Sequence, residues 1–143
     1  MTSDFDVKRY WETSWGPACP FHADVLNVEL RAWDIEAGTV TLHMPYRPCF
    51  DNSGVAEEAV VHGGVLASFV DVCTSFALAI KTEGKGGVTV NLQVDCLAPA
   101  RRTALTGTAR TVKCGRKIGV AEVDIIDESG KRVATGRQTC FMG

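Results

Sequence analysis

The longest apolar run in the chain, residues 60–80, contains one acidic residue and no proline. It reads VVHGGVLASFVDVCTSFALAI, and the acid is Asp71. From Val65 onwards, apolar side chains fall on every face of a helix, which predicts a helix enclosed by the fold rather than one lying on a surface. The run is somewhat short for a membrane span, which needs about 20 apolar residues, and its middle carries an acid. We therefore expect the core helix of a soluble protein.

Asp71 is the one residue of this run whose burial needs an explanation. A buried carboxylate must be hydrogen-bonded, paired or functional. Ser68, Thr74 and Ser75 lie three or four positions away and can reach it. These hydroxyls either satisfy a structural aspartate or support a catalytic one, and the residue types alone leave both interpretations open.

Composition and charge exclude several classes of protein. A chain of 143 residues fits one domain, and its net charge of -2 gives no nucleic-acid or membrane footprint. The N-terminus lacks the basic start and apolar run of a signal peptide. Six scattered cysteines without a CxxC pair predict free thiols and a cytoplasmic location. Three histidines without an HxH or HExxH pattern argue against a metal site, and no cofactor is expected.

Hydrophobic patterning predicts the remaining elements. Residues 3–15 favour a short amphipathic helix capped by Ser3 or Asp4, whose aromatic face either packs on the domain or lines a pocket; packing is favoured. Two alternating runs, 26–32 and 39–44, predict a β-hairpin. Short turns at 99–103, 114–117 and 127–131 favour antiparallel neighbours among four later strands, at 87–97, 104–113, 118–126 and 132–141.

The order of elements limits the architecture to two arrangements. A helix between two early and four late strands is either enclosed by a strongly curved antiparallel sheet or packed on one face of an open sheet. Because the helix is apolar all round, the wrapped arrangement fits better. We predict an α+β fold with a curved antiparallel β-sheet wrapped around a long central helix. The open edges of such a sheet invite pairing with a second copy.

Two glycines open the helix, in the tripeptide His62-Gly63-Gly64. Glycines let a ligand approach the backbone closely, and the first amides of a helix lack internal partners and carry the positive end of its dipole. That arrangement suits a developing oxyanion, such as the carbonyl oxygen of a thioester under attack. The alternative is that the glycines only permit a tight turn. An acid nine residues after the histidine, within an apolar helix, makes the first interpretation stronger.

The 60–80 stretch resembles the central helix of the hotdog-fold acyl-CoA thioesterases, in particular the phenylacetate-pathway type within the 4-hydroxybenzoyl-CoA thioesterase superfamily. The later stretch GVTVNLQVDCLAPA resembles the family's strand after the helix, and residues 106–141 resemble its closing three strands. The resemblance covers residues 21–142. It implies an N-terminal helical extension at 1–20 and a single hotdog domain at 21–143, which hydrolyses a small or medium acyl-CoA, aryl thioesters included.

The resemblance also implies roles for individual residues. Asp71 would be the catalytic carboxylate, acting as nucleophile on the thioester carbon or as base for water. The N–H of Gly63 would be the main oxyanion donor, with Gly64 beside it, while His62 orients the turn. Thr89 would help to position water or the carboxylate. Such sites lie between subunits, so Asp71 of one chain would face Gly63 of the other in a homodimer, or in a homotetramer built from two dimers.

One position departs from the family's pattern. Relatives have an Asn about six residues before the histidine, where this chain has Ala56. Asn52 lies ten residues before it, as if residues had been inserted. Either Asn52 loops back into the site, or Glu57 or Glu58 replaces it, or the function is altered.

Further residues are candidates for supporting the carboxylate and binding the substrate. Asp71 must be ionised to attack, which requires hydrogen-bond donors; Thr74, Ser75 and Thr89 are candidates, the first two also for substrate contact. A zone without acidic residues follows Asp95 and is either a phosphate site for coenzyme A or a solvated strand face. Its basic residues are Arg101, Arg102, Arg110, Lys113, Arg116 and Lys117, of which Arg116 and Lys117, at a turn, are the better candidates.

Two rival functions stay open at this point. A hotdog hydratase or dehydratase acting on an acyl thioester would need His62 as its central base. A non-catalytic acyl-CoA-binding protein would keep the fold without turnover, and the departure at Ala56 motivates that alternative.

Overall fold

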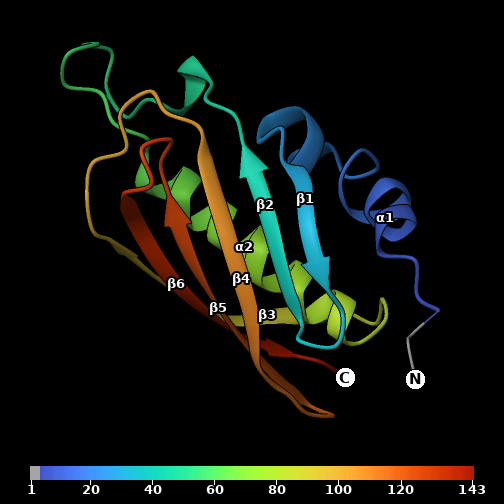
Figure 1. Cartoon of the computed structure of the whole chain (residues 1–143). Helices are drawn as coiled ribbons and strands as arrows, with labels where there is room; N and C mark the ends of the chain where they lie inside the picture. The colour runs from blue at the N-terminus through green and yellow to red at the C-terminus, as the bar shows by residue number, and fades with distance from the viewer. Residues whose placement is uncertain (1–3) are drawn as a thin grey trace.

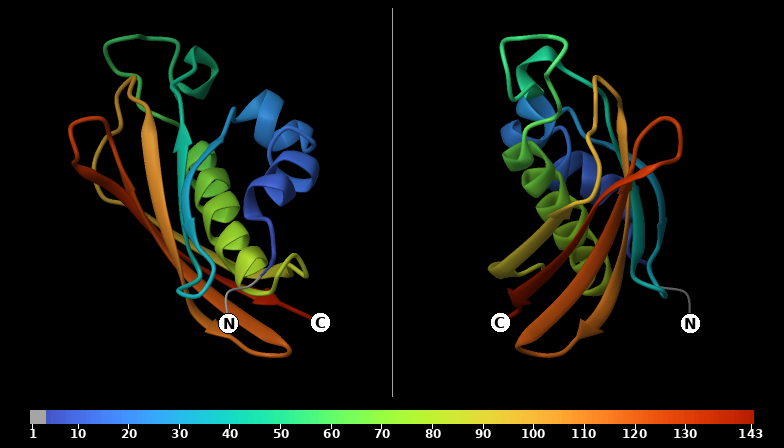
Figure 2. Two further views of the ribbon diagram at one scale, coloured as in Figure 1. Left: turned by 45° about the vertical axis from the view of Figure 1, so that its right-hand side comes forward. Right: turned by 90° about the vertical axis from the view of Figure 1, so that its left-hand side faces the viewer.

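Helix α2, Gly63–Lys81, runs through the middle of the molecule, and a six-stranded antiparallel sheet curves around it (Figures 1 and 2). The structure is a computed structural model that describes residues 4–143. The sheet has the order β1-β2-β4-β5-β6-β3, with β1 at Glu29–Asp34, β2 at Thr39–Met44, β3 at Val88–Cys96, β4 at Leu105–Cys114, β5 at Ile118–Ile126 and β6 at Arg132–Phe141. The predicted wrapped arrangement is confirmed.

Two details of the predicted sheet are wrong. A helical turn, η2 at Phe21–Val25, ends at Leu26, so β1 begins three residues later than its alternating pattern suggested. The short connection after β3 does not join antiparallel neighbours, because β3 pairs with β6 at the edge of the sheet. The connection instead passes beside the segment that precedes α2, where Val61 donates its N–H to the carbonyl of Ala100 at 2.8 Å.

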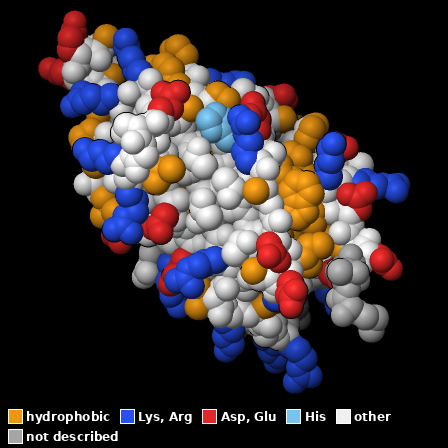
Figure 3. Space-filling view, viewed as in Figure 1, with side chains coloured by type: hydrophobic (Ala, Val, Ile, Leu, Met, Phe, Trp, Pro, Cys, Tyr) orange, Lys and Arg blue, Asp and Glu red, His pale blue; other side chains and the backbone are white. Residues whose placement is uncertain are grey.

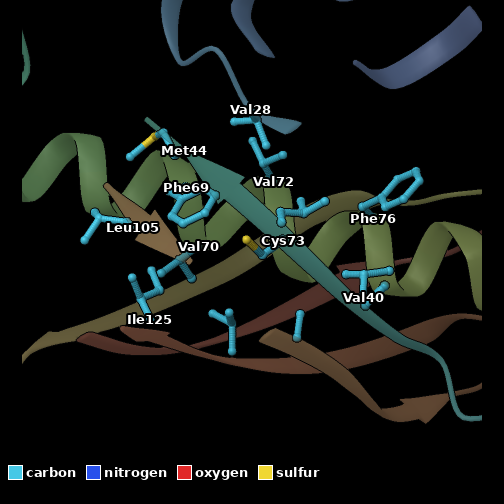
Figure 4. Close-up of a cluster of buried hydrophobic side chains, with 14 of the residues drawn as sticks. Val28, Val40, Met44, Phe69, Val70, Val72, Cys73, Phe76, Leu105 and Ile125 are labelled. Carbon is cyan, nitrogen blue, oxygen red and sulfur yellow. The ribbon is translucent and has the colours of Figure 1, made fainter. Parts of the chain in front are cut away.

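The core forms where α2 meets the sheet. Figure 4 shows Phe69, Val70 and Cys73 of α2 pointing toward side chains of the surrounding strands. Phe69 is fully buried. Gly136 of β6 allows close approach, because a Cβ atom there would lie only 2.4 Å from Cγ1 of Val70. The helix therefore lies close against β6, which decides what the side chains of Asp71 and β6 can touch.

The N-terminal segment covers the side of α2 that faces away from the sheet (Figure 2). Helix α1, Val7–Tyr10, continues as a π-helical turn, η1, over Trp11–Trp15. The ring of Trp11 meets Phe76 of α2 edge-on, with ring centroids 5.0 Å apart. The prediction that this aromatic face packs on the domain is confirmed.

The cap of α1 differs from the predicted one. The carboxylate of Asp6 accepts the backbone N–H of Arg9 at 2.9 Å, so Asp6 rather than Asp4 caps the helix. Ser3, the other predicted cap, lies outside the described residues, as do residues 1 and 2 of the predicted extension. The helix starts later than predicted because Asp6, two residues after Asp4, supplies the acceptor.

Within residues 4–143, α2 is the one helix whose length and composition would suit a membrane span. Its apolar side chains are largely enclosed between the sheet and the N-terminal segment. The apolar character of α2 is therefore explained by its burial in the core of the fold.

Candidate active site

A β-bulge in β3 turns Thr89 toward α2. Strict alternation would put Thr89 on the face opposite Leu92, but the register shifts between Thr89 and Asn91. The hydroxyl of Thr89 consequently lies 3.4 Å from Oδ1 of Asp71, while Val90 is 63% exposed. Bulges re-aim side chains in this way, often beside active sites.

Three donors converge on one oxygen of the Asp71 carboxylate. Besides Thr89, the hydroxyl of Ser75 lies 2.9 Å from Oδ1, and the side-chain amide of Gln138 donates to the same atom. Ser75 is one helical turn after Asp71, and Gln138 comes from the middle of β6. Hydrogen bonds to the charged form of a carboxylate favour that form. The candidates Ser75 and Thr89 are thus brought to Asp71.

The second oxygen of Asp71 is left available. Within residues 4–143, Oδ2 accepts no hydrogen bond, and no buried side-chain oxygen or nitrogen lacks a partner. Oδ2 therefore reaches solvent, although the residue as a whole is only partly exposed. A carboxylate with one oxygen tethered and the other open can receive a proton from water or attack a carbonyl carbon.

Gln138 is the residue that sequence reasoning missed. Its side chain is fully buried, and its Nε2 also donates to Thr89 Oγ1 at 3.0 Å. A signal existed in the sequence: Gln138 shares the inward face of β6 with Ala134, Gly136 and Cys140, so it is a polar residue in an apolar alternation. A buried amide in that position must have polar partners.

Thr74 and Cys140 contact the oxygen of the Gln138 side-chain amide. The hydroxyl of Thr74 lies 3.2 Å from Gln138 Oε1 and 2.8 Å from the carbonyl of Val70. Because Thr74 is fully buried, its place is in the support of the carboxylate and not at the substrate. The thiol of Cys140 lies 3.2 Å from Gln138 Oε1. Burial, and then the negative charge of Asp71, raise the pKa of that thiol, so it stays a neutral donor.

The start of α2 leaves one backbone donor free. His62 caps the helix: its Nδ1 accepts the N–H of Gly64 at 2.9 Å, and its carbonyl accepts the N–H groups of Val65 and Leu66. Within residues 4–143 the N–H of Gly63 has no acceptor. A Cβ atom on Gly63 would meet nothing within 4 Å, so neither packing within the chain nor a positive φ requires glycine there. Gly63 is therefore the accessible donor at this helix end.

A pocket of about 360 Å³ lies beside Gly63, and Asn52 lines it. The backbone N–H of Asn52 donates to the carbonyl of Val60, and its side-chain Oδ1 accepts the N–H of Val60 at 3.0 Å. Residues 53–59 thus form a loop that is closed by the hydrogen bonds between Asn52 and Val60. Asn52 lies at the base of this loop, beside the pocket. Glu57 and Glu58 are exposed and do not line this pocket. Most of its other lining is apolar: Val60, Val61, Leu66, Cys96, Leu97, Ala98, Pro99 and Ala100.

A single chain holds Gly63 and Asp71 apart. They are eight residues apart in α2, which is a rise of about 12 Å along the helix axis. One thioester carbonyl cannot touch both at hydrogen-bond distance. Strand β3, which carries Thr89, is an edge strand, and Val88 and Val90 beside it are 71% and 63% exposed. An edge of this kind can pair with another strand.

The basic residues that are close together in the sequence lie in three different parts of the structure. Arg102 lies 3.8 Å from Asp51, and Arg101 donates to the carbonyl of Glu57, both near the loop before α2. Arg110 pairs with Glu122 on a strand face. The remaining basic residues, Lys113, Arg116 and Lys117, are exposed around the β4–β5 turn, and within residues 4–143 they form no ion pair. Figure 3 shows Lys and Arg side chains gathered at the lower end of the molecule, where Figure 1 places that turn.

No metal centre is evident in the described part of the chain: residues 4–143 contain no group of three or more His, Cys, Asp or Glu side chains that could hold an ion.

Comparisons with known proteins show which proteins this chain is similar to. The family model of the thioesterase superfamily matches residues 58–134, which include the start of α2, Asp71 and Thr89. Acyl-coenzyme A thioesterase 13 of Mus musculus is 33% identical over 85 residues, which make up 58% of this chain and 61% of that protein. The chain thus matches less than two thirds of that relative's length.

Two solved structures are similar over nearly the whole chain. A phenylacetic acid degradation-related protein of Ralstonia eutropha superposes with a TM-score of 0.80 at 28% identity, covering 95% of this chain and 99% of that one. Zebra fish thioesterase superfamily member 2 superposes with a TM-score of 0.78 at 27% identity, covering 96% of both chains.

Proposed function

The chain belongs to the thioesterase superfamily, and we propose that it is an acyl-CoA thioesterase that hydrolyses a small or medium acyl-CoA, aryl thioesters included, to the free acid and coenzyme A. One observation carries the proposal: Asp71 has Oδ1 fixed by three donors and Oδ2 open to solvent. The neutral donors favour the ionised carboxylate, which is the form able to act as base or nucleophile.

The reaction uses Asp71 and Gly63 on opposite sides of the thioester. Oδ2 of Asp71 takes a proton from a water molecule, and the water oxygen bonds to the thioester carbon. The carbonyl oxygen becomes an oxyanion, which accepts the N–H of Gly63 at the positive end of α2. When the intermediate collapses, the carbon–sulfur bond breaks and the thiolate takes the proton from Asp71. Direct attack by Oδ2 gives the same products through an anhydride that water then hydrolyses.

The site is proposed to lie between two copies of the chain. Because Gly63 and Asp71 are about 12 Å apart along one helix, Asp71 and Thr89 of one copy would face Gly63 and the Asn52 pocket of another. The exposed edge strand β3 is the natural contact, since pairing two such edges satisfies their free backbone groups. We infer a homodimer as the smallest active unit, and two such dimers would make the homotetramer.

The remaining assignments follow from position and charge. Arg116 and Lys117 at the β4–β5 turn are proposed to bind the phosphates of coenzyme A, because they are exposed and unpaired within residues 4–143. Six free cysteines fit a reducing compartment, and we infer a cytoplasmic location.

A thiol-release assay tests the proposal. The wild-type protein is incubated with a panel of acyl-CoA thioesters, including short-chain, medium-chain and aryl members, and free coenzyme A is measured with a thiol reagent. We expect release that Asp71→Asn lowers by about 10²–10⁴-fold, the usual contribution of a general base. The matched control is Asp124→Asn, an exposed acid of β5 outside the proposed contact between copies, which should leave the rate unchanged.

Two other outcomes would overturn the proposal in different ways. Hydration of an enoyl-CoA without thiol release would identify a hydratase. Binding of acyl-CoA, measured by calorimetry, without turnover of any member would identify a binding protein. The use of His62 Nδ1 as an acceptor for Gly64 disfavours the hydratase, which needs that histidine as a base.

A further inference from the structure

We infer that Gln138 is a positioning residue of the reaction: its buried amide holds Oδ1 of Asp71 and thereby presents Oδ2 to water and the thioester. The inference rests on the proposed thioesterase function. It concerns a residue of the last strand, far in sequence from the helix that carries the resemblance to known enzymes.

The side chain of Gln138 is the centre of the polar cluster. It is fully buried, so it cannot touch a substrate in this chain. Its Nε2 donates to Asp71 Oδ1 and to Thr89 Oγ1, and its Oε1 lies 2.8 Å from Ser75 Oγ. One amide therefore joins both hydroxyl donors of the carboxylate and the carboxylate itself. Removing it would disturb all three contacts to Oδ1 at once.

The orientation of this amide is determined by what surrounds it. An ionised carboxylate only accepts hydrogen bonds, so the NH₂ group must face Asp71. The opposite side, Oε1, lies near the hydroxyls of Ser75 and Thr74 and the thiol of Cys140. The Ser75 proton is shared between Oε1 and Asp71 Oδ1, and the Thr74 proton between Oε1 and the Val70 carbonyl, so the Cys140 thiol is the donor that faces Oε1 alone. The raised pKa of Cys140 keeps the last of these donors protonated. The amide is thus locked with its donor group on the carboxylate.

Gly136 explains how Gln138 reaches Asp71. It lies two residues before Gln138 on the same face of β6, where a Cβ atom would lie 2.4 Å from Val70 of α2. The bare backbone lets the helix approach β6, and the amide at 138 then meets the carboxylate one residue after Val70. Positioning of this kind matters, since a displacement of about 1 Å can cost about 10²-fold in rate.

The charge environment gives Gln138 its importance. Within residues 4–143, no Lys, Arg or His forms an ion pair with Asp71. The groups that face the carboxylate are the hydroxyls of Ser75 and Thr89, the amide of Gln138 and, behind that amide, the thiol of Cys140. Among these groups, the amide of Gln138 is the one that donates two hydrogen bonds within the cluster, one to Asp71 Oδ1 and one to Thr89 Oγ1.

Two variants of similar size separate positioning from packing. Gln138→Met keeps the volume and removes the donor; we expect kcat to fall by about 10²-fold with KM changed less than about threefold, because Gln138 does not touch the substrate. Gln138→Glu keeps the shape but places two carboxyl groups together, and such pairs share one proton at low pH. This variant should be active at low pH, where the introduced acid donates to Asp71, and lose activity reversibly as pH rises through a range in which the wild type stays active.

A measurement on the wild-type protein tests the contact without any substrate. The side-chain amide signals of Gln138 are followed by ¹⁵N NMR during acid titration, with Asp71→Asn as control. We expect the Gln138 amide signals to shift with pH in the wild type and not in Asp71→Asn. This measurement does not depend on whether Gln138→Met folds.

The outcomes distinguish the inference from the function beneath it. A wild type that releases no thiol from any acyl-CoA overturns the proposed function, and the NMR step then decides alone whether Gln138 holds Asp71. If the wild type is active, either of two results overturns the inference. One is a Gln138→Met variant that retains the wild-type kcat, and the other is a Gln138 amide signal that shows no titration step dependent on Asp71. An equal loss in Gln138→Glu at every pH also overturns it, because that result would indicate packing.

Discussion

Nδ1 of His62 accepts the backbone N–H of Gly64 over 2.9 Å, so this histidine caps helix α2 with the nitrogen that a base would need. Loss of a helix cap costs about 1 kcal/mol. We therefore expect His62→Ala to lower the free energy of unfolding by about that amount and to leave kcat within about tenfold of wild type. Urea denaturation and thiol release measure the two effects.

A side chain that restores the cap provides the control for His62. Asn is a strong N-cap residue, so His62→Asn should recover the stability lost in His62→Ala. A fall in activity as large as that of Asp71→Asn, in both variants, would show that His62 takes part in proton transfer.

Gly63 allows its backbone donor to be removed by substitution. It is the first residue of α2, a position where proline is well tolerated, and His62 before it has the extended backbone that proline prefers, with φ -56° and ψ 136°. Gly63→Pro deletes the N–H and should lower kcat by about 10²–10³-fold, the usual cost of one oxyanion donor. Gly63→Ala adds a Cβ atom but keeps the N–H, and should retain most of the activity. Equal losses in both variants would assign the effect to crowding.

We expect Thr89 to contribute through its hydroxyl and not through its size. Thr89→Val has nearly the same shape and removes the hydrogen bond to Asp71 Oδ1, worth about 1 kcal/mol, together with the acceptor of one hydrogen bond from the Gln138 amide. We expect kcat to fall by about fivefold to tenfold with little change in melting temperature, since the residue is exposed in the chain. Thr89→Ser should restore the rate. Loss of activity in the Ser variant as well would point to the methyl group, and hence to packing.

Gly136 should be the most sensitive glycine of the sheet to substitution. The added Cβ atom of Gly136→Ala would lie 2.4 Å from Val70, and overpacking of this kind costs about 1–3 kcal/mol. Thermal unfolding should show the loss, and Val70→Ala in the same chain should recover part of it. Gly54→Ala, where a Cβ atom meets nothing within 4 Å, is the matched control. An unchanged melting temperature in Gly136→Ala would contradict the close packing of α2 on β6.

Sequence patterns predicted what depends on neighbours along the chain. The all-round apolar character of residues 65–80 indicated an enclosed helix, and strands β5 and β6 begin and end at the predicted residues. The HGG tripeptide indicated a helix start with exposed amides, and Asn52 proved to line the pocket beside Gly63. Each of these features follows from local spacing and residue type.

Features that depend on contacts between distant segments were missed. The bulge at Val90 has no local signature, so strict alternation along the strand does not explain how Thr89 reaches Asp71. Gln138 meets Asp71 only because β6 lies under α2, a pairing 67 residues apart in the sequence. The connection after β3 was misread because short links more often join neighbouring strands.

We propose that one thioester-cleaving site combines Asp71 of one copy with Gly63 of another, and mixing two inactive variants tests this shared site. Asp71→Asn and Gly63→Pro chains are combined in equal amounts, dissociated in mild denaturant and reassembled, and thiol release is compared with each variant treated alone. Random pairing makes half the dimers mixed, each with one intact site, so a shared site should recover about a quarter of wild-type activity. A mixture no more active than the two variants alone, although mixed dimers have formed, would contradict it.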